Sequence, residues 1–240
     1  MIKCTKHESF LGENGSYFVI IFYICTLFGI KLEKMREGSL QNHVIATAQK
    51  LFYKEGVRAV TMDKVAQSLR MSKRTLYELF ADKEDLLVAC IEDSYKEFND
   101  KMRAATKPED SVIDIILRSF SFRLEWSKDI SPAFFSEAHN YPKVETLFER
   151  QSESMRADFC EFYHRGVDEG LFIGQLNPHL LYLSFVSMMG VIRDYSTTDP
   201  LQPFDLLLNT YLVHARGFST EKGRKLIDEF VDSYRREHTI

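Results

Sequence analysis

Residues 61–80 read TMDKVAQSLRMSKRTLYELF, and this stretch decides the fold of the first part of the chain. Thr61 and Ser72 are residue types that begin helices, because their hydroxyl oxygens accept hydrogen bonds from the unpaired backbone N–H groups of a first helical turn. Apolar residues then recur at helical spacing, namely Met62, Val65, Ala66 and Leu69 in the first segment and Leu76, Leu79 and Phe80 in the second. The spacing predicts two short helices joined by a tight turn.

The second predicted helix presents polar and basic side chains opposite its apolar face. Lys73, Arg74, Thr75 and Tyr77 gather near its amino end. Such side chains donate hydrogen bonds to DNA phosphates and to base acceptors. Two short capped helices of which the second is basic are typical of a DNA-binding helix-turn-helix. An ordinary corner of a helical bundle is the alternative interpretation of the same pattern.

The flanking segments are also helical in pattern. Upstream, an apolar stripe from Val44 to Phe52 predicts a helix that ends near Gly56, where glycine permits a left-handed cap. Downstream, Asp82 is placed to cap a long helix that reaches Met102 and connects this region to the rest of the chain. The first part of the chain therefore reads as three helices followed by a connecting helix.

The charge is unevenly distributed along the chain. The 240 residues are 45% hydrophobic and 28% charged, an ordinary globular balance, and the net charge is −4. Seven basic and two acidic residues lie between Lys50 and Arg74, so this segment carries +5 and the remainder carries −9. A basic block on an acidic chain is the distribution expected when one small module meets phosphate.

Three runs of sequence resemble the amino-terminal DNA-binding domain of the TetR family of transcriptional regulators, each at the spacing of that family. They are residues 59–66 (AVTMDKVA), 71–80 (MSKRTLYELF) and 83–87 (KEDLL), within a resemblance that covers roughly residues 40–91. The chain departs from the family pattern in two places. Its turn reads Leu69-Arg70-Met71 where glycine is usual, and Arg74 stands where the recognition helix often carries glycine.

The resemblance implies a set of DNA-contacting residues. These are Thr61, Met62, Lys73, Arg74, Thr75, Tyr77 and Lys83. Thr61 and Met62 would lie near a phosphate strand. Lys73, Arg74 and Thr75 would face base edges or flanking phosphates. Tyr77 and Lys83 would hold phosphate. The position implied for Lys83 also makes physical sense, because a helix that starts after Asp82 presents free backbone N–H groups to an anion.

The remainder of the chain predicts further helices separated by proline, glycine and polar residues. The expected segments are 112–126, 132–140, 143–169, 180–192, 204–218 and a last amphipathic helix around 226–234. Segments 180–192 and 204–218 are apolar nearly all round, which indicates burial on several sides. They are either two core helices of a monomer or helices shared with a second copy. Because TetR-family members dimerise through their last two long helices, the resemblance favours a homodimer through helices near 178–192 and 203–218.

The aromatic content of this second part indicates a ligand pocket, since pockets between helices are mainly apolar with a few polar groups. The candidate ligand-binding residues are Phe122, Arg123, Trp126, His164 and Tyr182. By contrast, nothing predicts an enzyme, a metal site or a cofactor. The four cysteines form no C-x-x-C pair and the seven histidines have no metal-ligand spacing.

Residues 17–30 form a run of fourteen largely apolar positions. A membrane-spanning helix needs about 20 residues, so the run is short for a span. Three interpretations stay open: a non-native extension with Met35 as the true start, an additional helix, or a membrane anchor.

Taken together, the sequence predicts an all-α cytoplasmic protein. Its expected parts are an extension over residues 1–34, a three-helix helix-turn-helix domain over 38–98 and a helical effector-binding and dimerisation domain over 99–240. The expected function is sequence-specific binding to a double-stranded DNA operator as a transcriptional regulator, a repressor released by an unidentified small-molecule effector. The alternative is a helical module for protein or membrane interaction without effector control.

Overall fold

The computed structural model describes residues 39–138, 140–195 and 203–238. The extension over residues 1–34, with its apolar run, lies outside the described residues. The predicted all-α class is confirmed, because the described part of the chain consists of helices and a single isolated β-bridge between Phe172 and Ser219. No described helix combines the length and the apolar character needed to cross a membrane.

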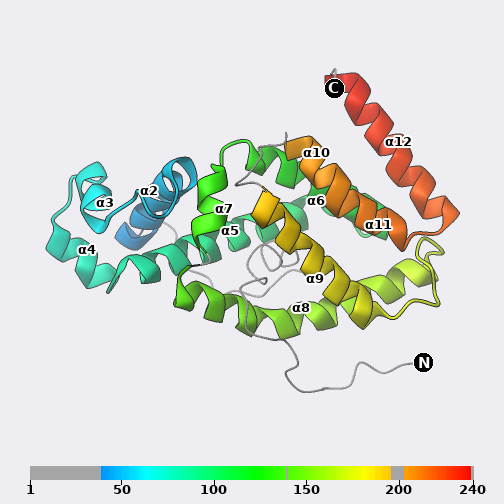
Figure 1. Cartoon of the computed structure of the whole chain (residues 1–240), viewed down its shortest axis with the longest axis horizontal. Helices are drawn as coiled ribbons and strands as arrows, with labels where there is room; N and C mark the ends of the chain where they lie inside the picture. Colours follow the sequence, from blue (N-terminus) through cyan, green and yellow to red (C-terminus); the bar gives the residue numbers. More distant parts are fainter. Residues whose placement is uncertain (1–38, 139, 196–202, 239–240) are drawn as a thin grey trace.

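Three helices pack at one end of the molecule and form what we call the module, residues 39–80 (Figure 1). They are α2 (Leu40–Glu55), α3 (Met62–Ser68) and α4 (Lys73–Leu79). Each begins at a serine or threonine whose hydroxyl accepts a backbone N–H three residues further on, as the sequence predicts for Thr61 and Ser72. Their apolar faces meet in a core in which Phe52, Val65 and Leu76 are fully buried.

The connecting helix α5 (Lys83–Ala105) runs from the module into the second part of the molecule, which we call the body (Figure 1). The body contains α6 (Val112–Ser127), α7 (Pro132–Ala138), α8 (Pro142–Asp168), α9 (Pro178–Tyr195), α10 (Pro203–Leu207), η1 (Leu208–Leu212), α11 (Val213–Gly217) and α12 (Glu221–His238). Aromatic side chains dominate its core, and α12 packs on the outside against α6 and α11. These bounds agree with the predicted segments to within a few residues, except at α12, which begins five residues earlier.

The predicted helix over 204–218 contains a feature that the periodicity does not reveal. Helices α10 and α11 are continuous, but the five residues between them form a turn of π-helix, η1. A π-turn inserts one extra residue into the helical repeat and so rotates the side chains that follow it. Such turns occur frequently at functional sites.

The module and the body touch through more than the connecting helix. Tyr53 of α2 packs edge-on against Phe134 and Trp126 of the body, with ring centroids 4.8 and 5.6 Å apart. The backbone N–H of Ser131 donates to the carbonyl of Tyr53 at 2.8 Å. Helix α7 therefore contacts α2 directly. The body is joined to the module both by α5 and by this contact.

Charged residues strengthen this second contact. The carboxylate of Glu137 on α7 accepts a hydrogen bond from the backbone N–H of Arg58 at 2.7 Å. Gly56 permits this approach, because a Cβ at that position would lie 2.9 Å from the same carboxylate. On α8, Lys143 forms ion pairs at 2.7 Å with both Asp82 and Asp85 at the start of α5. The hydrogen bond from Lys143 keeps the pKa of Asp82 below its ordinary value.

Candidate DNA-binding site

Helix α4 lies at the outer end of the module (Figure 1). Its charged residues are exposed to solvent. Leu76 is completely buried beneath the helix, and this anchor fixes which face of the helix points outward. Lys73 and Arg74 have side chains that are 64% and 89% exposed, and Tyr77 is 49% exposed. The two cations can pair with phosphate groups, and the exposed ring of Tyr77 can contact apolar surface. DNA offers both kinds of partner.

Acidic neighbours hold both cations of this face. Lys73 pairs with Asp63 of α3 at 2.5 Å, and Arg74 pairs with Glu78 one turn along α4 at 3.0 Å. Exposed ion pairs of this kind contribute little to stability. Either cation can therefore exchange its carboxylate for a phosphate or a base at small cost.

Two of the predicted contact residues also serve as parts of helix caps. Thr61 is exposed and accepts the backbone N–H of Lys64 at 3.2 Å as the cap of α3. Thr75 lies one turn into α4, and its hydroxyl is 2.8 Å from that of the capping Ser72. Of the predicted DNA-contacting side chains of α4, Lys73, Arg74 and Tyr77 are exposed and Thr75 is half-buried, and Thr61 lies at the start of the neighbouring helix.

The side chains of Met62 and Lys83, two further predicted DNA contacts, pack against other parts of the protein. Met62 is only 6% exposed and packs in the module core, so its side chain supports α3 instead of facing DNA. The ammonium of Lys83 lies 5.7 Å from the ring centroid of Tyr141 in the body. Desolvation there lowers the pKa of Lys83, although Glu137 opposes the shift. Lys83 reaches a phosphate only by leaving this contact.

Comparison with known proteins shows which family the module resembles. The sequence profile of the bacterial regulatory proteins of the tetR family matches residues 44–90. An HTH-type transcriptional regulator of Staphylococcus aureus is 28% identical over 97 residues, which are 40% of this chain and 52% of that protein. Residues 44–90 thus resemble the DNA-binding domain of the TetR family. The chain spans about half the length of the curated relative that it matches.

Solved structures of TetR-type regulators share the fold of both parts. A TetR-family transcriptional regulator from Marinobacter aquaeolei aligns with a TM-score of 0.62 at 17% identity, over 82% of this chain and 98% of that one. A transcriptional regulator from Saccharomonospora viridis, solved in complex with choline, aligns with a TM-score of 0.60 at 16% identity, over 75% and 98%. At these identities the likeness concerns the fold alone.

The turn between α3 and α4 shows the consequence of one departure from the TetR pattern. Arg70 stands in the turn that usually carries glycine and has φ of 52°, the left-handed region. Among the described residues other than glycine, no other has a positive φ. A side chain in this region costs roughly 1–2 kcal/mol relative to the right-handed conformation.

We therefore expect the Arg70→Gly variant to be more stable than the natural protein by roughly 0.5–1 kcal/mol, since glycine removes the strain but makes the unfolded chain more flexible. The measurement is the urea midpoint of unfolding. The matched control is Gln67→Gly, an exposed position inside α3, which should lower stability by about 1 kcal/mol. A similar loss in both variants would contradict the prediction.

The candidate ligand residues of the body do not gather at one site. His164 is exposed on α8, whereas Trp126 packs on Tyr53 beside the module. Phe122 is half-buried against Phe98 of α5, and Tyr182 is buried against Phe159. Because the five residues come from three helices and face different neighbours, sequence spacing did not reveal which of them share a cavity.

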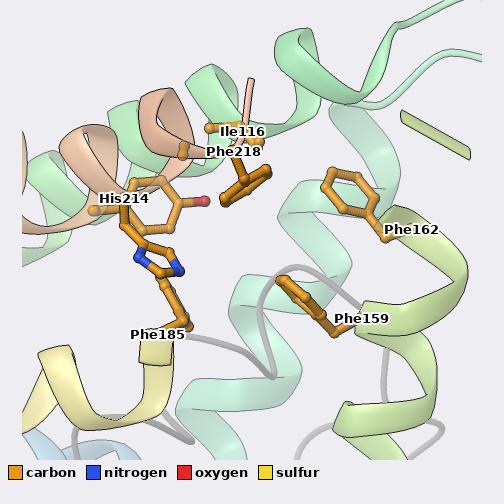
Figure 2. Close-up of a pocket in the computed structure, with 8 residues that line it drawn as sticks. Ile116, Phe159, Phe162, Phe185, His214 and Phe218 are labelled. Carbon is orange, nitrogen blue, oxygen red and sulfur yellow. The ribbon is translucent and has the colours of Figure 1, made fainter. Parts of the chain in front are cut away.

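A pocket lies elsewhere in the body, between α6, α8, α9 and the η1–α11 segment (Figure 2). Six of the residues that line it are aromatic: Phe159, Phe162, Phe185, Tyr211, His214 and Phe218. None of the five predicted ligand residues lines it, although Arg123 and Tyr182 pack directly behind its walls. An excess of aromatic residues was the correct signal, but their assignment to a pocket depends on how the helices cross.

Proposed function

We propose that this protein is a sequence-specific DNA-binding transcriptional regulator, a repressor that a small molecule releases from its operator. The observation that carries the proposal is the exposed face of α4, where Lys73, Arg74 and Tyr77 point away from the module core. Residues 38–98 would be the DNA-binding domain and 99–240 the effector-binding and dimerisation domain. The protein would act on chromosomal DNA in the cytoplasm, and as a regulator it is not an enzyme.

We further propose that it binds DNA as a homodimer through α9 and the α10–α11 segment. Leu180 on α9 is 61% exposed and Val213 on α11 is 53% exposed, and both are large apolar residues. The two helices are adjacent, because the ring of His214 hydrogen-bonds the backbone of Leu181. A second copy covering this face would remove apolar surface from water and would present two α4 helices to successive half-sites.

Effector control is supported by the aromatic pocket and by the two contacts that join the body to the module. The structural neighbour from Saccharomonospora viridis was solved with choline, and another neighbour, from Bacillus halodurans, is described as a fatty acid degradation regulator. These neighbours support small-molecule control of this chain as part of the proposal.

The test of DNA binding uses the full chain and a duplex from the region upstream of its own gene. We expect retardation of the duplex with an affinity that falls steeply as salt rises, since each neutralised phosphate contributes about −0.9 to the slope of log K against log salt. Lys73→Ala should weaken binding to all sequences alike and reduce that slope by roughly one. A protein that retards neither this duplex nor a library of random duplexes would contradict the proposal.

A helical module for protein or membrane interaction is the second candidate. The exposed cations on α4 favour such an interaction module over a helical bundle that binds no partner. DNA binding explains the same cations equally well. Binding to anionic vesicles without any retention of DNA would favour this alternative.

A further inference from the structure

The pocket of the body is partly open, and its lining is almost wholly apolar. Figure 2 shows Phe159 and Phe162 of α8 on one side, with His214 and Phe185 on the other. The cavity encloses about 20 Å³, which is room for about one water-sized group. A ligand with a ring therefore enters only if phenyl side chains turn aside, and this requirement favours compact molecules.

One polar atom in this lining lacks a partner among the described residues. The Nε2 atom of His214 is buried and makes no hydrogen bond. The backbone of Leu181 is a hydrogen-bond partner of the ring, and Nε2 is not the nitrogen that makes this bond. In the tautomer with the proton on Nδ1, Nε2 carries a lone pair and accepts.

The ring of His214 is also uncharged at neutral pH. Burial lowers its pKa to about 4, and the bond to Leu181 offsets only part of the shift. A buried acceptor without a donor is unfavourable, because it has lost its hydrogen bond to water. A ligand that brings an O–H or N–H group to Nε2 recovers part of this cost.

The surroundings disfavour a charged ligand. The guanidinium of Arg123, itself only 3% exposed, lies 5.4 Å from the ring centroid of Tyr211 behind the pocket wall. An added cation would meet this positive charge, although aromatic rings alone attract cations. An anionic ligand needs a hydrogen-bond donor, but His214 Nε2 would offer it only a lone pair. The described residues that line the pocket include no acidic side chain.

We propose that the pocket binds a compact neutral molecule with an apolar or aromatic body and one hydroxyl or N–H donor, which His214 Nε2 accepts. This inference rests on the proposed effector control and specifies its ligand chemistry. The π-turn η1 adds an independent observation, since it ends immediately before α11 and sets the rotation of Tyr211 and His214. A ligand between α8 and α11 would also bear on the helices proposed to form the dimer.

The experiment compares three probes on the full chain by fluorine NMR and competition. 4-Fluorophenol carries the donor, 4-fluorotoluene has nearly the same shape without it, and benzyltrimethylammonium carries a positive charge. We expect 4-fluorophenol to bind at least as tightly as 4-fluorotoluene, despite its greater affinity for water, and the cation to bind at least about tenfold more weakly than 4-fluorophenol. Binding of the cation more tightly than 4-fluorophenol, or binding of none of the probes, would overturn the proposal.

The role of His214 is tested by the His214→Leu variant. The preference for 4-fluorophenol over 4-fluorotoluene, expressed as a ratio of dissociation constants, should fall roughly tenfold or more, because the variant lacks the acceptor. The matched control is His164→Leu, the same substitution at an exposed histidine of α8 that does not line the pocket. That variant should keep the preference, and an unchanged ratio in folded His214→Leu would overturn the assignment.

A measurement on the natural protein covers the case in which His214→Leu does not fold. With histidine labelled by nitrogen-15, the Nε2 resonance should move on addition of 4-fluorophenol and stay in place with 4-fluorotoluene. Equal shifts with both probes would overturn the hydrogen bond. Operator affinity is measured with the same probes. If 4-fluorophenol occupies the pocket through His214 without weakening the operator complex, the pocket chemistry stands and effector control is the part that fails.

Discussion

Replacing Arg74 with alanine is expected to reduce affinity for the operator by roughly 5- to 150-fold, while affinity for random duplexes changes little. A well-placed bidentate contact to a base discriminates by about 1–3 kcal/mol. Arg74 is the most exposed cation of α4, and its partner Glu78 lies on the same exposed face. The measurement is the ratio of specific to random dissociation constants at one salt concentration.

The matched control for this prediction is Glu78→Gln. It removes the carboxylate that holds Arg74 at 3.0 Å and leaves the guanidinium in place. Operator affinity should stay the same or rise, because a negative charge facing phosphate is lost. If Arg74→Ala leaves the specific-to-random ratio unchanged, Arg74 does not read a base.

Replacing Val213 with glutamate is expected to raise the dissociation constant of the dimer by at least about 100-fold. Val213 is 53% exposed in the single chain, and in the proposed dimer it would lie in a dry interface. Leaving a charge buried without a partner costs roughly 3–5 kcal/mol. Operator binding should fall with the dimer, since a single module holds only one half-site. Analytical ultracentrifugation at micromolar concentration measures the change.

The control for this prediction lies on another surface. Leu226 on α12 is 37% exposed and is also apolar, but it belongs to neither proposed dimer helix. Leu226→Glu should sediment as the natural protein does and keep operator binding. A natural protein that already sediments as a monomer at micromolar concentration would remove the basis of the dimer proposal.

Two structural routes would carry the proposed coupling between pocket and operator. One is α5, which is continuous from the module into the body. The other is the contact of α7 with the module through Glu137, together with that of α8 with the start of α5 through Lys143. Sequence reasoning identified only the first, because the second joins residues that are about 60 to 80 positions apart.

The helix starts are the part of this protein that the sequence by itself determined. Each of four helices has a capping side chain that accepts a backbone N–H three residues away, namely Ser39, Thr61, Ser72 and Asp82. Because both partners of such a bond are close in the sequence, the sequence alone predicts it. The same holds for the apolar stripe of each helix and for the outward face of α4. The all-α class and the family resemblance followed from these local patterns.

The tertiary structure alone decided which side chains share a site. Met62 follows the cap of α3 as the family pattern requires, yet packing of the module buries it. The pocket draws on α6, α8, α9, η1 and α11, so its membership depends on crossing angles and on the rotation introduced by a π-turn. Burial between distant helices lowers the pKa of His214, and the backbone of Leu181 opposes only part of that shift. Helical periodicity carries no information on such contacts, because they form only when distant helices pack.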